Sequence, residues 1–224
     1  MRTLHGFAAA SLTLACFALP GHAGVISTLG SWNGVTDIGT FGSVAAEATP
    51  TYGETFTAAA GEDVLQTINF EIENESSVAI PYNAYVYAWD GSELSGGALF
   101  ASGLESIPVG AGFQEISVSV PNLSLADGSQ YVAFFSTIGD GGSNLTEAAW
   151  GGDMPDSAYP GGTFVYSNDA VFSDLSTGVW TSGSFGDLAF ELDFASPAPE
   201  PSTLILVGGA LLGLAGFRRK AARS

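Results

Sequence analysis

Three aromatic side chains alternate along one stretch of the chain and could stack on a sugar ring. Tyr85, Tyr87 and Trp89 fall on one face of an extended strand, and small residues fill the other face. An exposed aromatic strip could pack against the apolar faces of sugars, and would then form a glycan-binding platform. We expect instead that these rings fill the core opposite Phe70 and Phe134, because aromatic side chains supply much of the buried area of protein interiors.

A loop rich in acidic and small residues could hold a calcium ion. Calcium takes six to eight oxygen ligands and tolerates irregular loops. The spacing does not match an EF-hand, so a solvated acidic loop is the simpler interpretation and calcium the alternative. Asp187, Glu191 and Asp193 form a second candidate set on the last expected strand, although outward-facing acids are usually only solvated. The candidate ligands in the loop are Asp140, Asn144, Glu147, Asp153 and Asp156.

The basic residues and the single cysteine lie only at the two ends of the chain. The sequence has 23 acidic and five basic residues, a net charge of −18, and 22 of the acids fall within residues 24–196. That region contains no Lys, Arg, His or Cys. The composition therefore excludes disulfides, thiol nucleophiles and Ser-His-Asp chemistry, and it disfavours phosphate and nucleic acid as ligands.

Pairs of carboxylates could hydrolyse glycosidic bonds, but the sequence gives this idea no support. Such enzymes need two acids at a set separation across a cleft. With so many acids some pair is inevitable, and without basic side chains only burial and like charges can perturb a catalytic acid. We expect no enzymatic activity and no cofactor other than calcium as an alternative.

The first 23 residues are expected to form a helical signal peptide. Arg2 provides a short basic start, and residues 7–19 form an apolar run. Gly21 and Ala23 place small residues at the positions that signal peptidase reads, which predicts cleavage after Ala23. Lipidation at Cys16 is disfavoured, because this residue lies inside the apolar run.

The last 28 residues, 197–224, contain three physically distinct parts. Pro199, Glu200 and Pro201 cannot be helical, because proline restricts its own backbone and that of its neighbour. Residues 202–217 carry no charge and predict a membrane helix, although sixteen residues span only about 24 Å against a hydrocarbon core of about 30 Å. The basic tail over 218–224 is expected to remain in the cytoplasm. Its membrane stop consists of Arg218, Arg219 and Lys220.

This arrangement resembles the PEP-CTERM sorting signal of Gram-negative bacteria, which exosortases process. The likeness is carried by the Pro-Glu-Pro motif at 199–201, the short glycine-rich helix at 202–217 and the cations at 218–220. It implies recognition by an exosortase, cutting near the motif and an association with exopolysaccharide systems.

Residues 24–196 are expected to form one all-β domain. Apolar side chains alternate with polar ones in short runs that are separated by Gly, Asp and Asn, and no amphipathic helix is evident. Eight or more short strands at this spacing favour a β-sandwich, and in particular a jelly roll, between the signal helix and the membrane helix. The strands are expected at 53–57, 64–72, 82–89, 98–101, 115–120, 130–137, 163–167 and 187–194.

Together these patterns predict an exported, non-enzymatic protein of the cell surface or the exopolysaccharide matrix. Signal peptidase and an exosortase are its expected processing enzymes, and the inner membrane holds it transiently through the C-terminal helix. A glycan-binding module, stabilised by calcium, is the alternative. Nucleic acid is not an expected partner.

Overall fold

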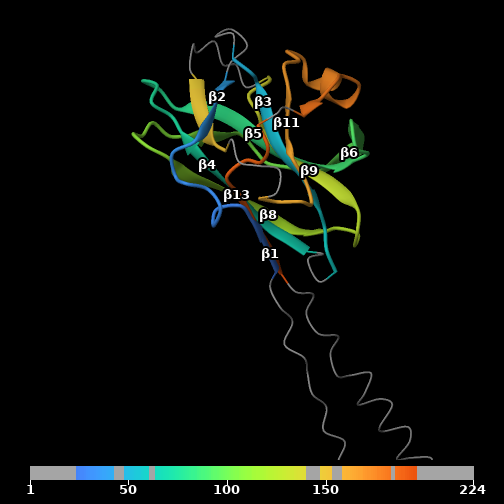
Figure 1. The fold of residues 1–224 in the computed structure, drawn as a ribbon. Helices are drawn as coiled ribbons and strands as arrows, with labels where there is room; N and C mark the ends of the chain where they lie inside the picture. Colours follow the sequence, from blue (N-terminus) through green and yellow to red (C-terminus); the bar gives the residue numbers. More distant parts are fainter. Residues whose placement is uncertain are drawn as a thin grey trace, which may run out of the picture. The chain divides into compact units, whose positions relative to one another are not determined.

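Two antiparallel sheets make up the part of the chain that the structure describes (Figure 1). The computed structural model describes residues 24–42, 48–60, 64–139, 147–152, 158–182 and 185–195. The prediction of an all-β fold is confirmed, and within these ranges the one helix is a short 3-10 turn, η2 (Phe172–Ser176). The expected signal peptide and the expected tail helix lie outside the described residues.

Sheet A is organised around its longest inner strand, β4 (Val64–Glu73). One edge of β4 pairs with β8, while its other edge pairs first with β13 and then with β10. The remaining strands, β1 and β2, lie at the two ends of the sheet order β1-β13-β4-β10-β2. Their bounds are β1 (Gly24–Ser27), β2 (Asp37–Gly42), β8 (Gln114–Ser124), β10 (Glu147–Gly151) and β13 (Phe190–Ala195).

Sheet B has the strand order β12-β11-β3-β9-β5-β6, and the short strand β7 also pairs with β5. The centre of the sheet is β9, which pairs with β3 on one side and with β5 on the other. The bounds are β3 (Thr51–Thr57), β5 (Ile80–Trp89), β6 (Leu94–Ala101), β7 (Glu105–Ile107), β9 (Gln130–Ser136), β11 (Phe164–Ser167) and β12 (Thr181–Ser182).

An aromatic core fills the space between the sheets. Side chains alternate along each strand, so one face of every strand turns inwards. Trp150 on β10 is fully buried at the centre, and its ring lies 4.7 Å from that of Phe70 on β4 and 5.4 Å from that of Phe135 on β9. Because Phe70 and Phe135 belong to different sheets, this cluster joins the two layers.

Each strand expected from alternation is present in the structure, with ends that differ by a few residues. The strands β1, β2, β7, β10 and β12 were not expected. They have two to six residues, which is too short for an alternating pattern to stand out, and their pairing with neighbouring strands defines them.

The chain enters and leaves the domain at the same end. Gly24 on β1 pairs with Phe194 on β13, and Ala195 pairs with Val64 at the start of β4. We call this the near end. Since β4 runs away from it, Glu73 and the loop that follows lie at the opposite end, the far end.

Candidate functional site

The three aromatic side chains of β5 lie on the outer face of sheet B. Val86, between them in sequence, points into the core between the sheets and is fully buried. The ring of Tyr85 stacks at 5.2 Å and that of Tyr87 at 5.7 Å from Phe134 on the neighbouring strand β9. Phe134 fits there because β3 carries Gly53 beside it, where a Cβ would fall 2.6 Å from the Phe134 Cβ.

A segment from elsewhere in the chain covers this aromatic face. The covering segment, residues 168–180, includes η2 and packs Leu175 and Trp180 over the outer face of sheet B (orange in Figure 1). The Trp180 Nε1 donates a hydrogen bond of 2.8 Å to the Leu175 carbonyl, which stabilises the conformation of the segment. The ring of Phe172 lies 4.7 Å from that of Tyr85, and the ring of Trp180 lies 5.8 Å from that of Trp89.

These contacts decide how much of the predicted platform reaches solvent. Tyr87 is 8% exposed, and its burial raises the pKa of its hydroxyl, while Tyr85 and Trp89 are half-buried. The rings pack against Phe134 as expected. The expectation that Phe70 faces them is wrong, because β5 turns Ala84 and Val86, and not these three aromatic side chains, towards the core that contains Phe70.

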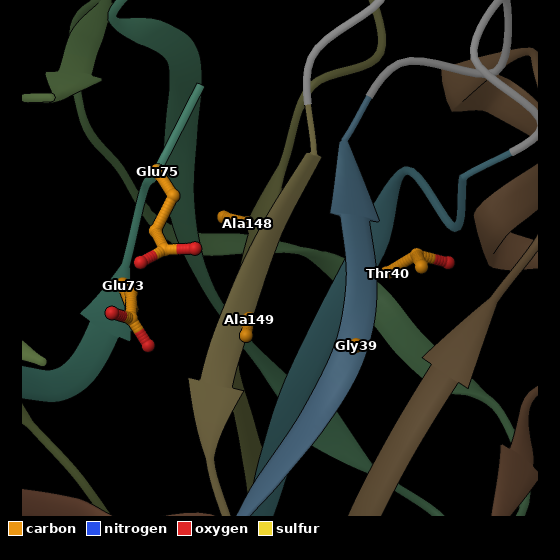
Figure 2. A pocket seen from close by; sticks show the side chains of 6 residues that line it. All are labelled: Gly39, Thr40, Glu73, Glu75, Ala148 and Ala149. Carbon is orange, nitrogen blue, oxygen red and sulfur yellow. The ribbon is translucent and has the colours of Figure 1, made fainter. Parts of the chain in front are cut away.

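A shallow hollow lies on the far end of sheet A. Its volume is about 200 Å³, and strands β2, β4 and β10 line it (Figure 2). The carboxylates of Glu73 and Glu75 stand along one side of it, and Ala148 and Ala149 along the strand opposite. Small side chains leave the floor open to the backbone. Its lining residues are Gly39, Thr40, Glu73, Glu75, Ala148 and Ala149.

The polar groups of this hollow accept hydrogen bonds or attract cations. The Glu73 Oε1 accepts a hydrogen bond of 2.6 Å from the Gly112 amide, which holds this carboxylate in place. Glu75 also lines a second hollow of about 380 Å³, together with Val109, Gly110 and Ala111. An acidic strip of this kind suits hydroxyl groups or ammonium groups and repels anionic ligands.

The rest of the outer face of sheet A is polar and acidic. Glu71 and Glu115 are direct cross-strand partners. Burial, and secondarily the charge of Glu115, raise the pKa of Glu71. Asn69 donates a hydrogen bond of 3.3 Å to the Asp193 Oδ2, and Glu191 pairs across from the same asparagine.

The structure separates the second candidate set for calcium. Glu191 and Asp193 lie half-buried on the outer face of sheet A, but Asp187 is 0% exposed and precedes the strand. The expectation that Asp187 faces outwards is therefore wrong. Its neighbour Leu188 donates its amide to the side chain of Glu54, so the chain leaves the regular pattern of the ladder there.

Most of the first candidate set for calcium lies outside the described residues. This holds for Asp140, Asn144, Asp153 and Asp156, and for Glu147 the structure describes the backbone alone, at the start of β10. Among the residues that are described, no group of three or more His, Cys, Asp or Glu side chains is placed to hold a metal ion.

Reasoning from the sequence did not foresee the burial of two acids, Glu54 and Asp187. Glu54 is 1% exposed and shares the inward face of β3 with Tyr52 and Phe56. A signal was present, because an acid flanked at two-residue spacing by two aromatic residues falls on their face of a strand. Asp187 carried no comparable signal, since its burial depends on packing against distant segments.

The C-terminal residues were compared with models of known protein families. Residues 197–220 match the PEP-CTERM protein-sorting motif. The match includes Pro199, Glu200, Pro201 and the cations at 218–220, as the sequence predicted. Comparisons with curated proteins and with solved structures gave no match.

The PEP-CTERM motif makes the chain an exported protein that an exosortase processes and that is held transiently in the membrane. The motif begins two residues after β13 ends at Ala195, which lies at the near end of the sandwich. The hollow beside Glu73 therefore lies at the end of the domain opposite the point where the chain leaves for the motif. No helix within the described residues is long and apolar enough to span a bilayer.

Proposed function

We propose that the protein is a non-enzymatic component of the cell surface or of the exopolysaccharide matrix. The observation that carries the proposal is the PEP-CTERM motif at 197–220, which follows a domain without a single Lys, Arg, His or Cys. A domain without these side chains lacks the usual bases, nucleophiles and anion-binding groups of enzymes. Its acidic surface favours solubility and cation binding.

Signal peptidase and an exosortase are the proposed processing enzymes. The proposed mature chain starts at Gly24, where β1 begins, and ends near the Pro-Glu-Pro motif. Both cuts then fall at the near end of the sandwich and leave every described strand intact. The inner membrane is the proposed transient partner, through the apolar helix at 202–217.

Intact-mass measurement after cell fractionation tests this proposal. We expect extracellular or surface protein without residues 1–23 and without the apolar tail. The variant Glu200→Gln should accumulate uncut in the membrane fraction, whereas the control Glu191→Gln, on the outer face of sheet A, should be processed normally. Full-length protein in the cytosol with both ends intact would contradict the proposal.

We also propose that the sandwich is a jelly roll. The long strands change sheet at most connections: β3 belongs to sheet B, β4 to A, β5 to B, β8 to A and β9 to B. Without β2 and β10, sheet A has the order β1-β13-β4-β8, and without β7, β11 and β12, sheet B has the order β3-β9-β5-β6. This interleaving of early and late strands supports a double Greek key. An experimental structure in which β1 does not pair with β13 would contradict it.

A second candidate function is glycan binding, assisted by calcium. Its support is the half-buried pair Tyr85 and Trp89 on sheet B, together with the carboxylates of Glu73 and Glu75 at the far end. Affinity electrophoresis in gels that contain the producing strain's own polysaccharide tests it, with and without calcium. Retardation that Trp89→Ala or Glu73→Gln abolishes is expected if the protein binds glycans, and unchanged mobility leaves the structural role.

A further inference from the structure

Two carboxyl groups are buried in a domain that contains no cationic side chain. Glu54 is 1% exposed and Asp187 is 0% exposed. Residues 24–196 contain no Lys, Arg or His, so no side chain of the domain can neutralise these acids as an ion pair. Buried acids are otherwise paired with cations or hold their proton.

The two carboxyl groups lie close to each other. The Glu54 Oε2 accepts a hydrogen bond of 3.0 Å from the Leu188 amide, and the Asp187 Oδ2 accepts one of 2.8 Å from the Tyr159 amide. Four covalent bonds join the Leu188 nitrogen to the Asp187 carboxyl carbon. The Glu54 oxygen therefore lies within about 8 Å of that carbon.

The elements packed around Glu54 add no charge of opposite sign. The neighbouring strands place Ala133 of β9 and Phe164 of β11 opposite it. Among the residues that the structure describes, the titratable side chains nearby are the phenols Tyr52, on the same face of β3, and Tyr159, in the segment before β11. Neither phenol supplies a positive charge.

We propose that Glu54 and Asp187 hold a proton between them at neutral pH, and that this proton makes the domain less stable as the pH rises. Burial disfavours the charged form of a carboxyl group, and a second carboxylate close by disfavours it further. The two effects act in the same direction here. The pair then titrates as a unit, with one group ionised and the other protonated over the neutral range.

The sign of the pH dependence follows from proton binding. In the unfolded chain both carboxyl groups ionise near pH 4. The folded domain retains one proton above that pH, so it binds more protons than the unfolded chain does. Stability from this pair is therefore complete below about pH 4 and is lost as the pH rises until the folded pair ionises.

The pair lies at a seam between segments that are far apart in sequence. Glu54 belongs to sheet B, Leu188 leads into β13 of sheet A, and Tyr159 also contacts Thr57 of β3 through its hydroxyl at 3.2 Å. Loss of the shared proton would place two negative charges at this seam. We therefore expect alkaline conditions to weaken the contact of the 158–163 segment and of residues 187–188 with β3.

Infrared spectroscopy of the full chain in detergent micelles tests the proposal directly. Exposed acids are ionised at pH 7.5, so a protonated-carboxyl band at that pH reports a buried proton. We expect the band in the unaltered protein, and its loss in Glu54→Gln or in Asp187→Asn. Glu191→Gln is the matched control, because it changes one acid on the outer face of sheet A and should leave the band unchanged.

Thermal unfolding at pH 5 and pH 9, followed by circular dichroism, gives a second readout. Repulsion among the surface acids lowers the melting temperature in every variant, so the comparison with Glu191→Gln removes that contribution. The control should lose about 5 °C more than Glu54→Gln does between the two pH values. The proposal is overturned if the unaltered protein has no protonated-carboxyl band at pH 7.5, a result that needs no variant to fold. It is also overturned if Glu54→Gln and the control lose equal amounts.

Discussion

The two outer faces of the sandwich have the same backbone geometry but differ in the chemistry of their side chains. On sheet B the outward side chains at the centre of β5 and β9 are aromatic or aliphatic, among them Tyr87, Val132 and Phe134, and the covering segment at 168–180 packs over them. On sheet A the outward side chains of β4, β8 and β13 are acids, amides and hydroxyls, among them Glu71, Ser117 and Glu191. The two sheets share one core, yet one of them carries a second hydrophobic layer.

This difference shows that alternation along a strand defines two faces, but does not determine whether the outer face is covered by protein or solvated by water. Tyr85 and Tyr87 on β5 follow the same two-residue period as Asn69 and Glu71 on β4. The aromatic face is stable because Leu175 and Trp180 exclude water from it, and the acidic face is stable because water solvates it. The three predictions below test this contrast in order of decreasing effect.

The largest effect is expected from removing the tryptophan that covers sheet B. Trp180→Ala should destabilise the domain by about 3 kcal/mol, because it empties a site where the indole is 6% exposed. Trp32→Ala is the matched control on sheet A, where a half-buried indole lies against Gly151. Both indoles donate a hydrogen bond of 2.8 Å to a nearby carbonyl, so the pair differs mainly in burial.

Urea unfolding measures both variants. The control should lose about 1–2 kcal/mol, since less apolar surface is removed from its partners. Equal losses would mean that the covering segment stabilises sheet B no more than one exposed loop stabilises sheet A.

A smaller and pH-dependent effect is expected from the tyrosines, all seven of which lie in sheet B or in the segment before β11. Burial raises the pKa of Tyr87 on the outer face, and raises that of Tyr52 in the inner core to about 12. Unfolded tyrosines ionise near pH 10, so the folded state binds more protons between pH 10 and 12 and loses stability there.

Urea unfolding at pH 8 and at pH 11 measures this loss, and the absorbance of tyrosinate shows at which pH the phenols ionise. Tyr52→Phe should reduce the loss of stability by up to about 3 kcal/mol, and Tyr87→Phe should reduce it by less. The phenol of Tyr52 also donates a hydrogen bond of 2.9 Å to the Gly39 carbonyl, so the variant is compared at pH 8 first. If neither variant changes the loss of stability at alkaline pH, that loss does not come from these two phenols.

The smallest effect is expected on the acidic face of sheet A. Glu115→Gln removes the negative charge directly opposite Glu71 and should stabilise the domain by a few tenths of a kcal/mol. The pKa of Glu71 should fall towards its ordinary value, so stability should decrease less as the pH rises above about 4.5.

Nuclear magnetic resonance titration of the Glu71 carboxyl carbon checks this shift. Glu191→Gln is the control, because its cross-strand partner is Asn69 and not an acid. A similar change in the Glu71 titration in both variants would show that total charge, and not the cross-strand pair, sets its pKa.

The amino-acid sequence by itself determined the features that depend on local pattern and composition. The two-residue period located the main strands, the charge-free segment at 202–217 and the cations at 218–220 identified the sorting motif, and the missing basic residues excluded whole classes of chemistry. Each of these can be recognised within a few neighbouring residues or by counting.

The tertiary structure alone decided which side chains meet and which face is covered. The covering segment reaches the aromatic face of β5 from about ninety residues away. The buried contact between Glu54 and Leu188 spans 134 positions, and the residue beside it, Asp187, lies in the interior although strand alternation placed it on the surface. A pattern read along the strand contains no information about a partner that folding brings from so far along the chain.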